Sequence, residues 1–267
     1  MSTPLLRVQD AVVRYHQKGQ PPVTAVRGVS LDVHPGEIVG IVGESGCGKS
    51  SLARAMVGLN PVASGTIEFL GKPVSKLPIR RRTAAMIPLQ MVFQDPYSSL
   101  NPRRRIADQI AEVVRGSRKA QRQPVPGAAD LRAIVVDALA RVGLDPDLGA
   151  RFPHALSGGQ RQRVAIAKVL AVESRVIIAD EPISALDASS QKRVAALLRD
   201  LVVETGIGMA IISHDLAVVA SIADTTAVMR AGQFVEQGPT EQVWTAPTHP
   251  YTGQLLSAVP DLVRRAG

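Results

Sequence analysis

Residues 43–50 of the chain read GESGCGKS, a spacing of glycines, lysine and serine that suits phosphate binding. Glycines let backbone N–H groups fold around phosphate oxygens, and a helix that begins just after them turns its positive end toward the anion. Lys49 is expected to reach the β and γ phosphates of a nucleotide, and Ser50 to ligate Mg²⁺. The sequence therefore predicts an ATP and Mg²⁺ site formed by Gly43, Glu44, Ser45, Gly46, Cys47, Gly48, Lys49, Ser50 and Ser51.

Two carboxylates follow the apolar run VIIA at residues 176–179. This run predicts a buried strand, and ligand sites in open α/β sheets lie at the carboxyl ends of such strands. Asp180 would hold Mg²⁺ directly or through water, and Glu181 would activate the attacking water as a general base or orient it. An Asp-Glu pair alone is more often a solvated strand end, but combined with the phosphate-binding segment it predicts nucleotide hydrolysis.

The elements that must position these residues follow from apolar periodicity and from turn residues. The chain predicts strand, glycine loop and helix in that order, then a long helical stretch, and then a return to alternating strands and helices. We expect strands at 5–15, 23–33, 37–42, 66–70, 89–93, 176–179 and 209–213, helices at 49–57 and 189–204, and helical structure over 106–170 with a linker at 121–127. Continuous apolar strands flanked by helices imply a parallel sheet covered on both faces.

Composition narrows the class of protein without deciding its function. The chain has 267 residues, of which 45% are hydrophobic and 20% charged, so a folded globular body is expected. Its single cysteine, Cys47, excludes a disulfide within the chain and any cysteine-ligated metal cluster. The first residues lack the pattern of a signal peptide and no 18-residue apolar window occurs, so we expect neither export nor a membrane span.

The segment LSGGQ at residues 156–160 narrows the prediction further. Ser157 is a good N-cap, and the two glycines after it leave backbone amides open at a helix N-terminus. The segment, with RQRVAIAKVL after it, resembles the signature motif of ABC ATPases and the helix which that motif begins. The resemblance implies that Ser157, Gly158, Gly159 and Gln160 contact the γ-phosphate of a bound nucleotide.

Other motifs of the same family follow in order along nearly the whole chain. Gln94 in VFQDP resembles the Q-loop glutamine, which touches Mg²⁺ or water and senses the membrane partner. Residues 184–187, SALD, resemble the D-loop, and His214 in IISHD resembles the switch histidine at the γ-phosphate. Tyr15 occupies the position of an aromatic that stacks on adenine. The resemblance thus implies catalytic roles for Glu181, His214 and Gln94, and Mg²⁺ ligation by Ser50, Gln94 and Asp180.

The resemblance also implies a fold and a division into domains. The expected fold is α/β, with a RecA-like P-loop NTPase core, an antiparallel β subdomain and an inserted α-helical subdomain at roughly residues 100–170. An ABC ATPase domain would span residues 1–247, and residues 248–267 would form a C-terminal extension without a catalytic role. Proline at 247 and 250 would hold the start of this extension in an extended form before a short helix ending near Ala258.

Three segments resemble one branch of the family, the importers of dipeptides, oligopeptides and nickel. They are VFQDPYSSLNPR at 92–103, RFPHALSGGQRQRVAIAK at 151–168 and THPYTGQLL at 248–256. The resemblance implies a second, identical or related ATPase subunit, two transmembrane permease subunits and, indirectly, an extracytoplasmic solute-binding protein. It places the chain peripherally on the cytoplasmic face of the cell membrane.

A competing hypothesis is a soluble ABC ATPase that acts on nucleic acid or the ribosome. The observation behind this hypothesis is the net charge of +8, which could attract a polyanion. The basic residues are scattered and are not interleaved with stacking aromatics, and the chain has one ATPase cassette and no zinc-binding cysteines. The sequence therefore favours the importer subunit, and no nucleic-acid partner is expected.

Overall fold

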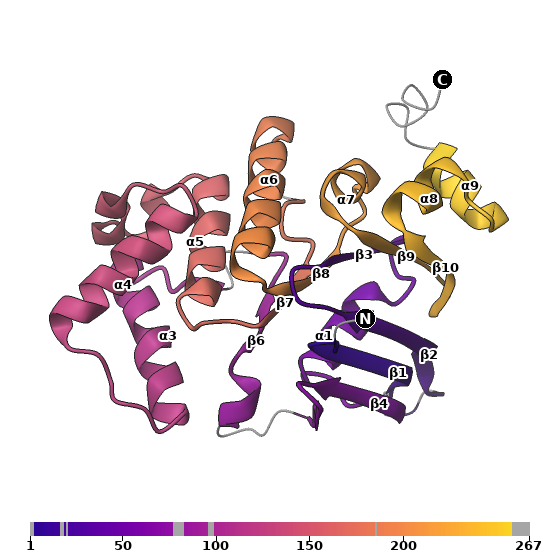
Figure 1. The fold of residues 1–267 in the computed structure, drawn as a ribbon, viewed down its shortest axis with the longest axis horizontal. Helices are drawn as coiled ribbons and strands as arrows, with labels where there is room; N and C mark the ends of the chain where they lie inside the picture. The colour runs from indigo at the N-terminus through magenta and orange to yellow at the C-terminus, as the bar shows by residue number, and fades with distance from the viewer. Residues whose placement is uncertain are drawn as a thin grey trace.

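A six-stranded sheet forms the centre of the fold in the computed structural model (Figure 1), which describes residues 3–16, 19, 21–76, 83–95, 99–184 and 186–257. Its strand order is β10-β9-β3-β8-β7-β6. Every neighbouring pair is parallel except β9 and β10, which are antiparallel. The strands are β3 (Ile38–Val42), β6 (Leu89–Val92), β7 (Val176–Asp180), β8 (Gly208–Ile212), β9 (Thr225–Arg230) and β10 (Gln233–Pro239).

A second sheet is antiparallel and has the order β2-β1-β4-β5. It comprises β1 (Leu6–Tyr15), β2 (Val23–Val33), β4 (Ser64–Phe69) and β5 (Lys72–Pro73). Alternate residues of β1 are buried, among them Leu6 and Val8, because successive side chains of a strand point to opposite faces. This sheet is the antiparallel β subdomain that the family resemblance implies.

The helices divide between the core and an inserted region. In the inserted region, α3 (Ile106–Ala120), α4 (Ala128–Arg141) and α5 (Gly158–Leu170) pack together beside the central sheet (Figure 1). Short 3₁₀ turns at Pro146–Ala150 and Pro153–Ala155 connect α4 to α5. The core helices are α1 (Lys49–Met56), α6 (Ala188–Thr205), α7 (Leu216–Ile222), α8 (Thr240–Thr245) and α9 (Pro250–Ser257).

Each face of the central sheet has its own hydrophobic core. Ile177, Met209 and Ile211 pack toward α5, α6 and α7. Their neighbours Ile178, Ala210 and Ile212 belong to a cluster with α1 and the antiparallel sheet. The strands are buried on both faces, as their continuous apolar composition predicts. Helices were expected to cover both faces of the central sheet. One face is instead covered by α1 together with the antiparallel sheet.

The observed elements up to β8 agree with the expected ones with two exceptions: the short strand β5 was not predicted, and residues 142–157 hold only 3₁₀ turns where helical structure was expected. The helical stretch is interrupted between Ala120 and Ala128, where the linker is expected, and β6 begins directly after Pro88. β9, β10, α7 and α8 were not predicted from the sequence. In the part of the chain that the structure describes, no helix has the length and apolar content that crossing a bilayer requires. Ala185 of the SALD segment, residues 96–98 and residues 258–267 lie outside the described residues.

Candidate functional site

The GESGCGKS segment forms the loop between β3 and α1, and its glycines are needed where they stand. Gly43, Gly46 and Gly48 have φ values of 150°, 80° and 115°, a region that L side chains rarely adopt. A Cβ at Gly43 would lie 2.1 Å from the Met229 carbonyl oxygen, and one at Gly48 would lie 2.2 Å from that of Ala25. The loop is therefore packed tightly against β9 and β2.

Lys49 is the first residue of α1 and bends back across this loop. Its buried ammonium donates hydrogen bonds to the carbonyl oxygens of Gly43, at 2.7 Å, and Glu44, at 2.8 Å. The cation is thus held at the rim of the loop by backbone oxygens. A phosphate bound inside the loop would meet a charge that is already in position.

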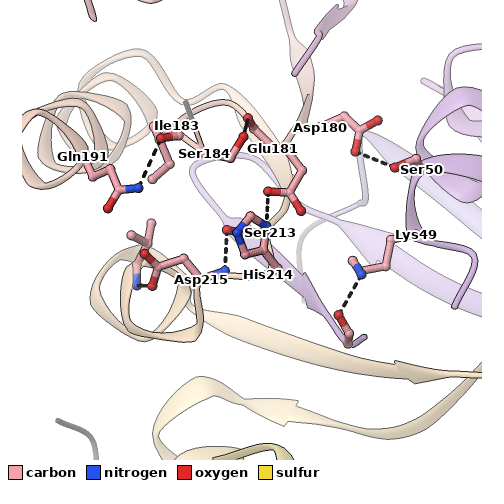
Figure 2. Close-up of polar contacts among 12 residues, drawn as sticks. Lys49, Ser50, Asp180, Glu181, Ile183, Ser184, Gln191, Ser213, His214 and Asp215 are labelled. Carbon is pink, nitrogen blue, oxygen red and sulfur yellow. Dashed lines mark hydrogen bonds and ion pairs between the residues drawn. The ribbon is translucent and has the colours of Figure 1, made fainter. Parts of the chain in front are cut away.

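Ser50 of α1 and Asp180 of β7 place side-chain oxygen atoms close together. The Ser50 hydroxyl donates to Oδ1 of Asp180 at 3.0 Å (Figure 2). Burial raises the pKa of the Asp180 carboxyl, and the hydrogen bond from Ser50 and the charges of Arg54 and Lys49 offset this rise only in part. A cation placed between these oxygens would compensate the buried carboxylate. Hydroxyl and carboxylate oxygens are also the ligands that Mg²⁺ prefers in proteins.

This pair does not form a complete metal site by itself. Among the described residues, no group of three or more His, Cys, Asp or Glu side chains is placed to hold a metal ion. Mg²⁺ commonly binds through one or two protein oxygens, substrate phosphates and water. The donor set fits an ion that arrives with a nucleotide.

Glu181 and His214 meet at the same edge of the sheet, because β7 and β8 are parallel neighbours whose carboxyl ends coincide. Oε2 of Glu181 lies 2.6 Å from Nδ1 of His214 (Figure 2), in a close contact outside hydrogen-bond geometry that is an ion pair only when the imidazole is protonated. Glu181 is buried and its backbone has φ 52°, whereas the His214 side chain is 63% exposed. The backbone N–H of Glu181 donates to the Ile212 carbonyl at 2.9 Å, which holds this left-handed turn in place.

The turn that carries His214 is fixed by its two neighbours. The Asp215 backbone N–H donates to the Ser213 hydroxyl at 3.0 Å, and the Asp215 carboxylate caps α7 by accepting from the Val218 N–H at 3.2 Å. Neither Ser213 nor Asp215 was predicted from the sequence to have a role in the site. Asp215 could have been identified as an N-cap, because Asp before an apolar helical run is a helix-start signal.

Gln94 lies beyond the end of β6, next to this group. Val92 of β6 pairs with Ala179 of β7, so Gln94 emerges at the same sheet edge as Asp180 and Glu181. Its side chain is exposed. The structure therefore places Gln94 beside the site, with an amide free to turn toward a bound ligand.

Tyr15 ends β1 next to the phosphate loop. Its hydroxyl donates to the Ser51 hydroxyl at 3.0 Å and accepts from the Asn60 side-chain amide at 2.7 Å. Ser51 belongs to α1, one residue after Ser50, so the Tyr15 ring lies alongside the start of that helix. This position suits an aromatic that packs against the base of a nucleotide. Asn60 is a further contact that sequence reasoning missed.

The signature segment lies apart from these residues. Ser157 caps α5 through a capping box, accepting from the Gln160 N–H at 3.3 Å and donating its own N–H to Oε1 of Gln160 at 2.9 Å. α5 packs mainly against α3, α4, α6 and β6, whereas α1 packs mainly against β1, β2, β7 and β8. Gly158 is exposed and Gly159 is half-buried, and both have their backbone amides in the first turn of α5. The chain therefore presents a phosphate loop and a helix N-terminus on different parts of its surface.

A protein-family model described as "ABC transporter" matches residues 26–184, more than half of the chain. The match includes the phosphate loop, the signature segment and both carboxylates. The chain belongs to the ABC transporter ATP-binding family. A second model, described as the C-terminal region of oligopeptide/dipeptide transporters, matches residues 235–267. These matches confirm the family that residues 43–50 and 156–160 indicate.

Curated relatives extend this ABC resemblance over nearly the whole chain. The oligopeptide transport ATP-binding protein OppF of Escherichia coli (strain K12) is 44% identical over 264 residues, which cover 96% of this chain and 78% of OppF. The di/tripeptide transport ATP-binding protein DppF of Pseudomonas aeruginosa (strain UCBPP-PA14) is 42% identical, covering 91% of this chain and 73% of DppF. Neither the relatives nor the family models support a soluble ATPase that acts on nucleic acid or the ribosome.

Solved ABC structures share the fold. The structure of cbiO1 from Clostridium perfringens has a TM-score of 0.77 at 28% identity, and the match covers 96% of this chain and all of cbiO1. The ADP- and phosphate-bound dimer of the ATP-binding cassette MJ0796 has a TM-score of 0.77 at 24% identity, covering 88% and 98% of the two chains. The α/β fold predicted from the sequence is confirmed.

Membership in the ABC family establishes that the chain binds and hydrolyses ATP. ATP-binding subunits of ABC importers dimerise and work with membrane permeases. The phosphate loop and the signature segment of this chain lie apart, as such pairing requires.

The structure also shows a contact of the C-terminal region with the phosphate loop, since the Glu44 N–H donates to the Tyr251 hydroxyl at 3.2 Å. Sequence reasoning assigned no role to Tyr251.

Proposed function

We propose that this ATPase energises the import of dipeptides, oligopeptides or similar small solutes through two permease subunits, from the cytoplasmic face of the cell membrane. The observation that carries the proposal is the C-terminal match at residues 235–267 to the oligopeptide/dipeptide transporter region. The identity of 44% with OppF supports it. An extracytoplasmic solute-binding protein would deliver the solute without touching this chain. The proposal includes the division of the chain into an ATPase domain, residues 1–247, and a C-terminal extension, residues 248–267.

In the proposed mechanism the chain binds MgATP at the loop of residues 43–51, with Tyr15 against adenine. Ser50, Asp180 and Gln94 would hold Mg²⁺, which neutralises phosphate charge when it is bound. Lys49 would contact the β and γ phosphates from its position at the loop rim. Glu181 would accept a proton from the attacking water or orient it, and His214 would contact the γ-phosphate.

The second half of each ATP site would come from another subunit. Gly158 and Gly159 offer open amides at the start of α5, and such a helix end favours an anion. In the proposed dimer, identical or mixed, this end faces the γ-phosphate held by the partner's loop. ATP then joins the two subunits, and hydrolysis releases them, which drives the permeases through their conformational cycle.

A groove beside Gln94 supports the permease partnership. Its volume is about 820 Å³, and it lies between β6, α3 and α5. Its lining is mostly apolar and includes Met91, Val113 and Val169, together with Phe93, which is 40% exposed. An exposed apolar groove of this kind is typical of an interaction site. We assign it to a permease segment, so that Gln94 would sense the partner at one end and the nucleotide at the other.

Co-purification tests this proposal. The chain, tagged and extracted from membranes in mild detergent, is expected to carry two multi-span membrane proteins, identified by mass spectrometry. Phe93→Asp should abolish their recovery, because a charge in the groove would have to be desolvated on docking. Nucleotide binding by the isolated Phe93→Asp chain should stay at the wild-type level. Recovery of the wild-type chain without a multi-span protein would contradict the transport role.

A further inference from the structure

One peptide group of the phosphate loop is held from both sides. The carbonyl oxygen of Gly43 accepts from the Lys49 ammonium at 2.7 Å, and the N–H of Glu44 donates to the Tyr251 hydroxyl at 3.2 Å. These two groups belong to the same planar trans peptide unit, so they point in opposite directions. Whatever fixes the direction of the Glu44 N–H therefore also fixes the direction of the Gly43 carbonyl, which is one of the two carbonyl groups that hold the Lys49 ammonium.

This peptide group needs an external restraint, because glycine precedes it. Gly43 has φ 150° and no Cβ, so its backbone can reach orientations that are closed to other residues. A rotated peptide would turn an N–H toward the Lys49 ammonium in place of the carbonyl. Two donors would then face each other. The Tyr251 hydroxyl could donate to the carbonyl of a rotated peptide, but the Lys49 ammonium would then lose that acceptor. The observed orientation is the one in which the Glu44 N–H and the ammonium are both paired, and the Tyr251 hydroxyl stabilises it by accepting from that N–H.

Tyr251 is itself held rigidly. Its side chain is buried at 3% exposure and packs in a cluster with Val42, the residue before the loop, and with Val243 of α8. The Arg230 guanidinium lies 4.7 Å from the centre of its ring, in a cation–π contact. Its backbone N–H donates to Nδ1 of His249 at 3.1 Å. These contacts fix the position of the Tyr251 hydroxyl relative to the phosphate loop.

The start of the C-terminal extension is anchored to the core by one carboxylate. Glu236 of β10 accepts from the Thr248 N–H at 2.7 Å, from the Thr248 hydroxyl at 3.0 Å and from the His249 N–H at 3.1 Å. Burial raises the pKa of the Glu236 carboxyl, but the hydrogen bonds that it accepts, among them those from Thr248 and His249, outweigh burial and lower the pKa overall. The anchor thus stays ionised at neutral pH and holds α9 against the loop.

We propose that Tyr251 is a positioning residue of the ATP site, which holds the Gly43–Glu44 peptide group so that its carbonyl places the Lys49 ammonium for phosphate binding. Residues 248–257 then serve nucleotide binding as well as any role in transport. The proposal depends on ATP binding at the loop and not on the transported solute. Failure of the peptide-import proposal would leave it intact, and the reverse also holds.

The variant Tyr251→Phe removes the acceptor and keeps the ring, its packing and its contact with Arg230. We expect the Kd for MgATP to rise about 3- to 10-fold, the range for one neutral hydrogen bond. The KM for ATP should rise by the same factor, while kcat at saturating ATP stays within about twofold, because Glu181 and Asp180 are untouched. Ser257→Ala is the matched control, since it removes one hydroxyl from α9 whose hydrogen bond, to the Gln254 carbonyl at 2.8 Å, stays within that helix. Its Kd should equal the wild-type value.

A double-mutant cycle with Lys49→Ala decides whether Tyr251 acts through Lys49. Binding of MgATP is measured by equilibrium dialysis in the full-length single and double variants. If the peptide group works by placing the ammonium, Tyr251→Phe should change the Kd by less than about 1.5-fold once Lys49 is absent. An equal loss in both backgrounds, an unchanged Kd in Tyr251→Phe alone, or an equal loss in Ser257→Ala would each overturn the proposal.

Discussion

The variant Glu181→Gln is expected to bind MgATP at least as tightly as the wild type and to hydrolyse it about 10²- to 10⁴-fold more slowly, the range for loss of a general base. Glutamine keeps the shape of the side chain, and the N–H bond to Ile212 is made by the backbone. The charge of Glu181 raises the pKa of the neighbouring Asp180 carboxyl. Its removal therefore reduces repulsion at the site and favours the nucleotide.

Glu173→Gln provides a matched control for this prediction. Glu173 also has a positive φ, of 57°, and its exposed carboxylate pairs with Arg118 away from the sheet edge. The same substitution there should leave turnover within about twofold, since exposed ion pairs contribute little to stability. Binding would be followed by equilibrium dialysis and turnover by phosphate release. Undiminished turnover in Glu181→Gln would contradict the role of this carboxylate.

A negative charge in the signature segment should also stop turnover, by a different route. Gly159→Asp is expected to lower ATP turnover of the assembled subunits at least about 100-fold, comparable to losing a donor that stabilises transition-state charge. The aspartate would face the γ-phosphate in the partner's loop. MgATP binding by the isolated chain should not change, because residues 157–160 lie on a different part of its surface from its own loop.

The fold should tolerate this change. A Cβ at Gly159 would meet Leu186 and Ser190 at 3.7 Å or more, which is ordinary contact, and aspartate is favourable in the first turn of a helix. Gly127→Asp is the control, because it places the same charge at the N-cap of α4 in the same helical region. It should leave turnover unchanged. Equal loss of MgATP affinity and of turnover in the isolated Gly159→Asp chain would contradict the shared ATP site.

The parts of the site that are formed by residues close together in the sequence could be predicted from the sequence. The spacing of residues 43–50 fixes a loop between a strand and a helix, and the apolar run before Asp180 fixes a buried strand. Because β7 and β8 are parallel neighbours, Glu181 and His214 then meet at one edge. Ser157 was likewise predicted as an N-cap, and it caps α5 in the structure.

Contacts between distant segments could not be predicted in this way. β9 and β10 carry Thr, Gln and Gly among their apolar residues, so their alternation is weak, and their pairing depends on the sheet already formed by β3. Nothing near Tyr251 in the sequence indicates that its hydroxyl reaches Glu44, which lies 207 residues away. The contacts of Tyr15 with Ser51 and Asn60 depend on tertiary packing in the same manner.

ATP-driven uptake is the most direct test of peptide import by this ATPase. Proteoliposomes would contain the chain with its co-purified membrane subunits and enclose MgATP, with the solute-binding protein and a pool of labelled di- and oligopeptides outside. We predict accumulation of labelled peptide inside vesicles that carry the wild-type chain, and none in vesicles with Glu181→Gln. No accumulation with enclosed ATP, or equal accumulation with both chains, would contradict the proposed function.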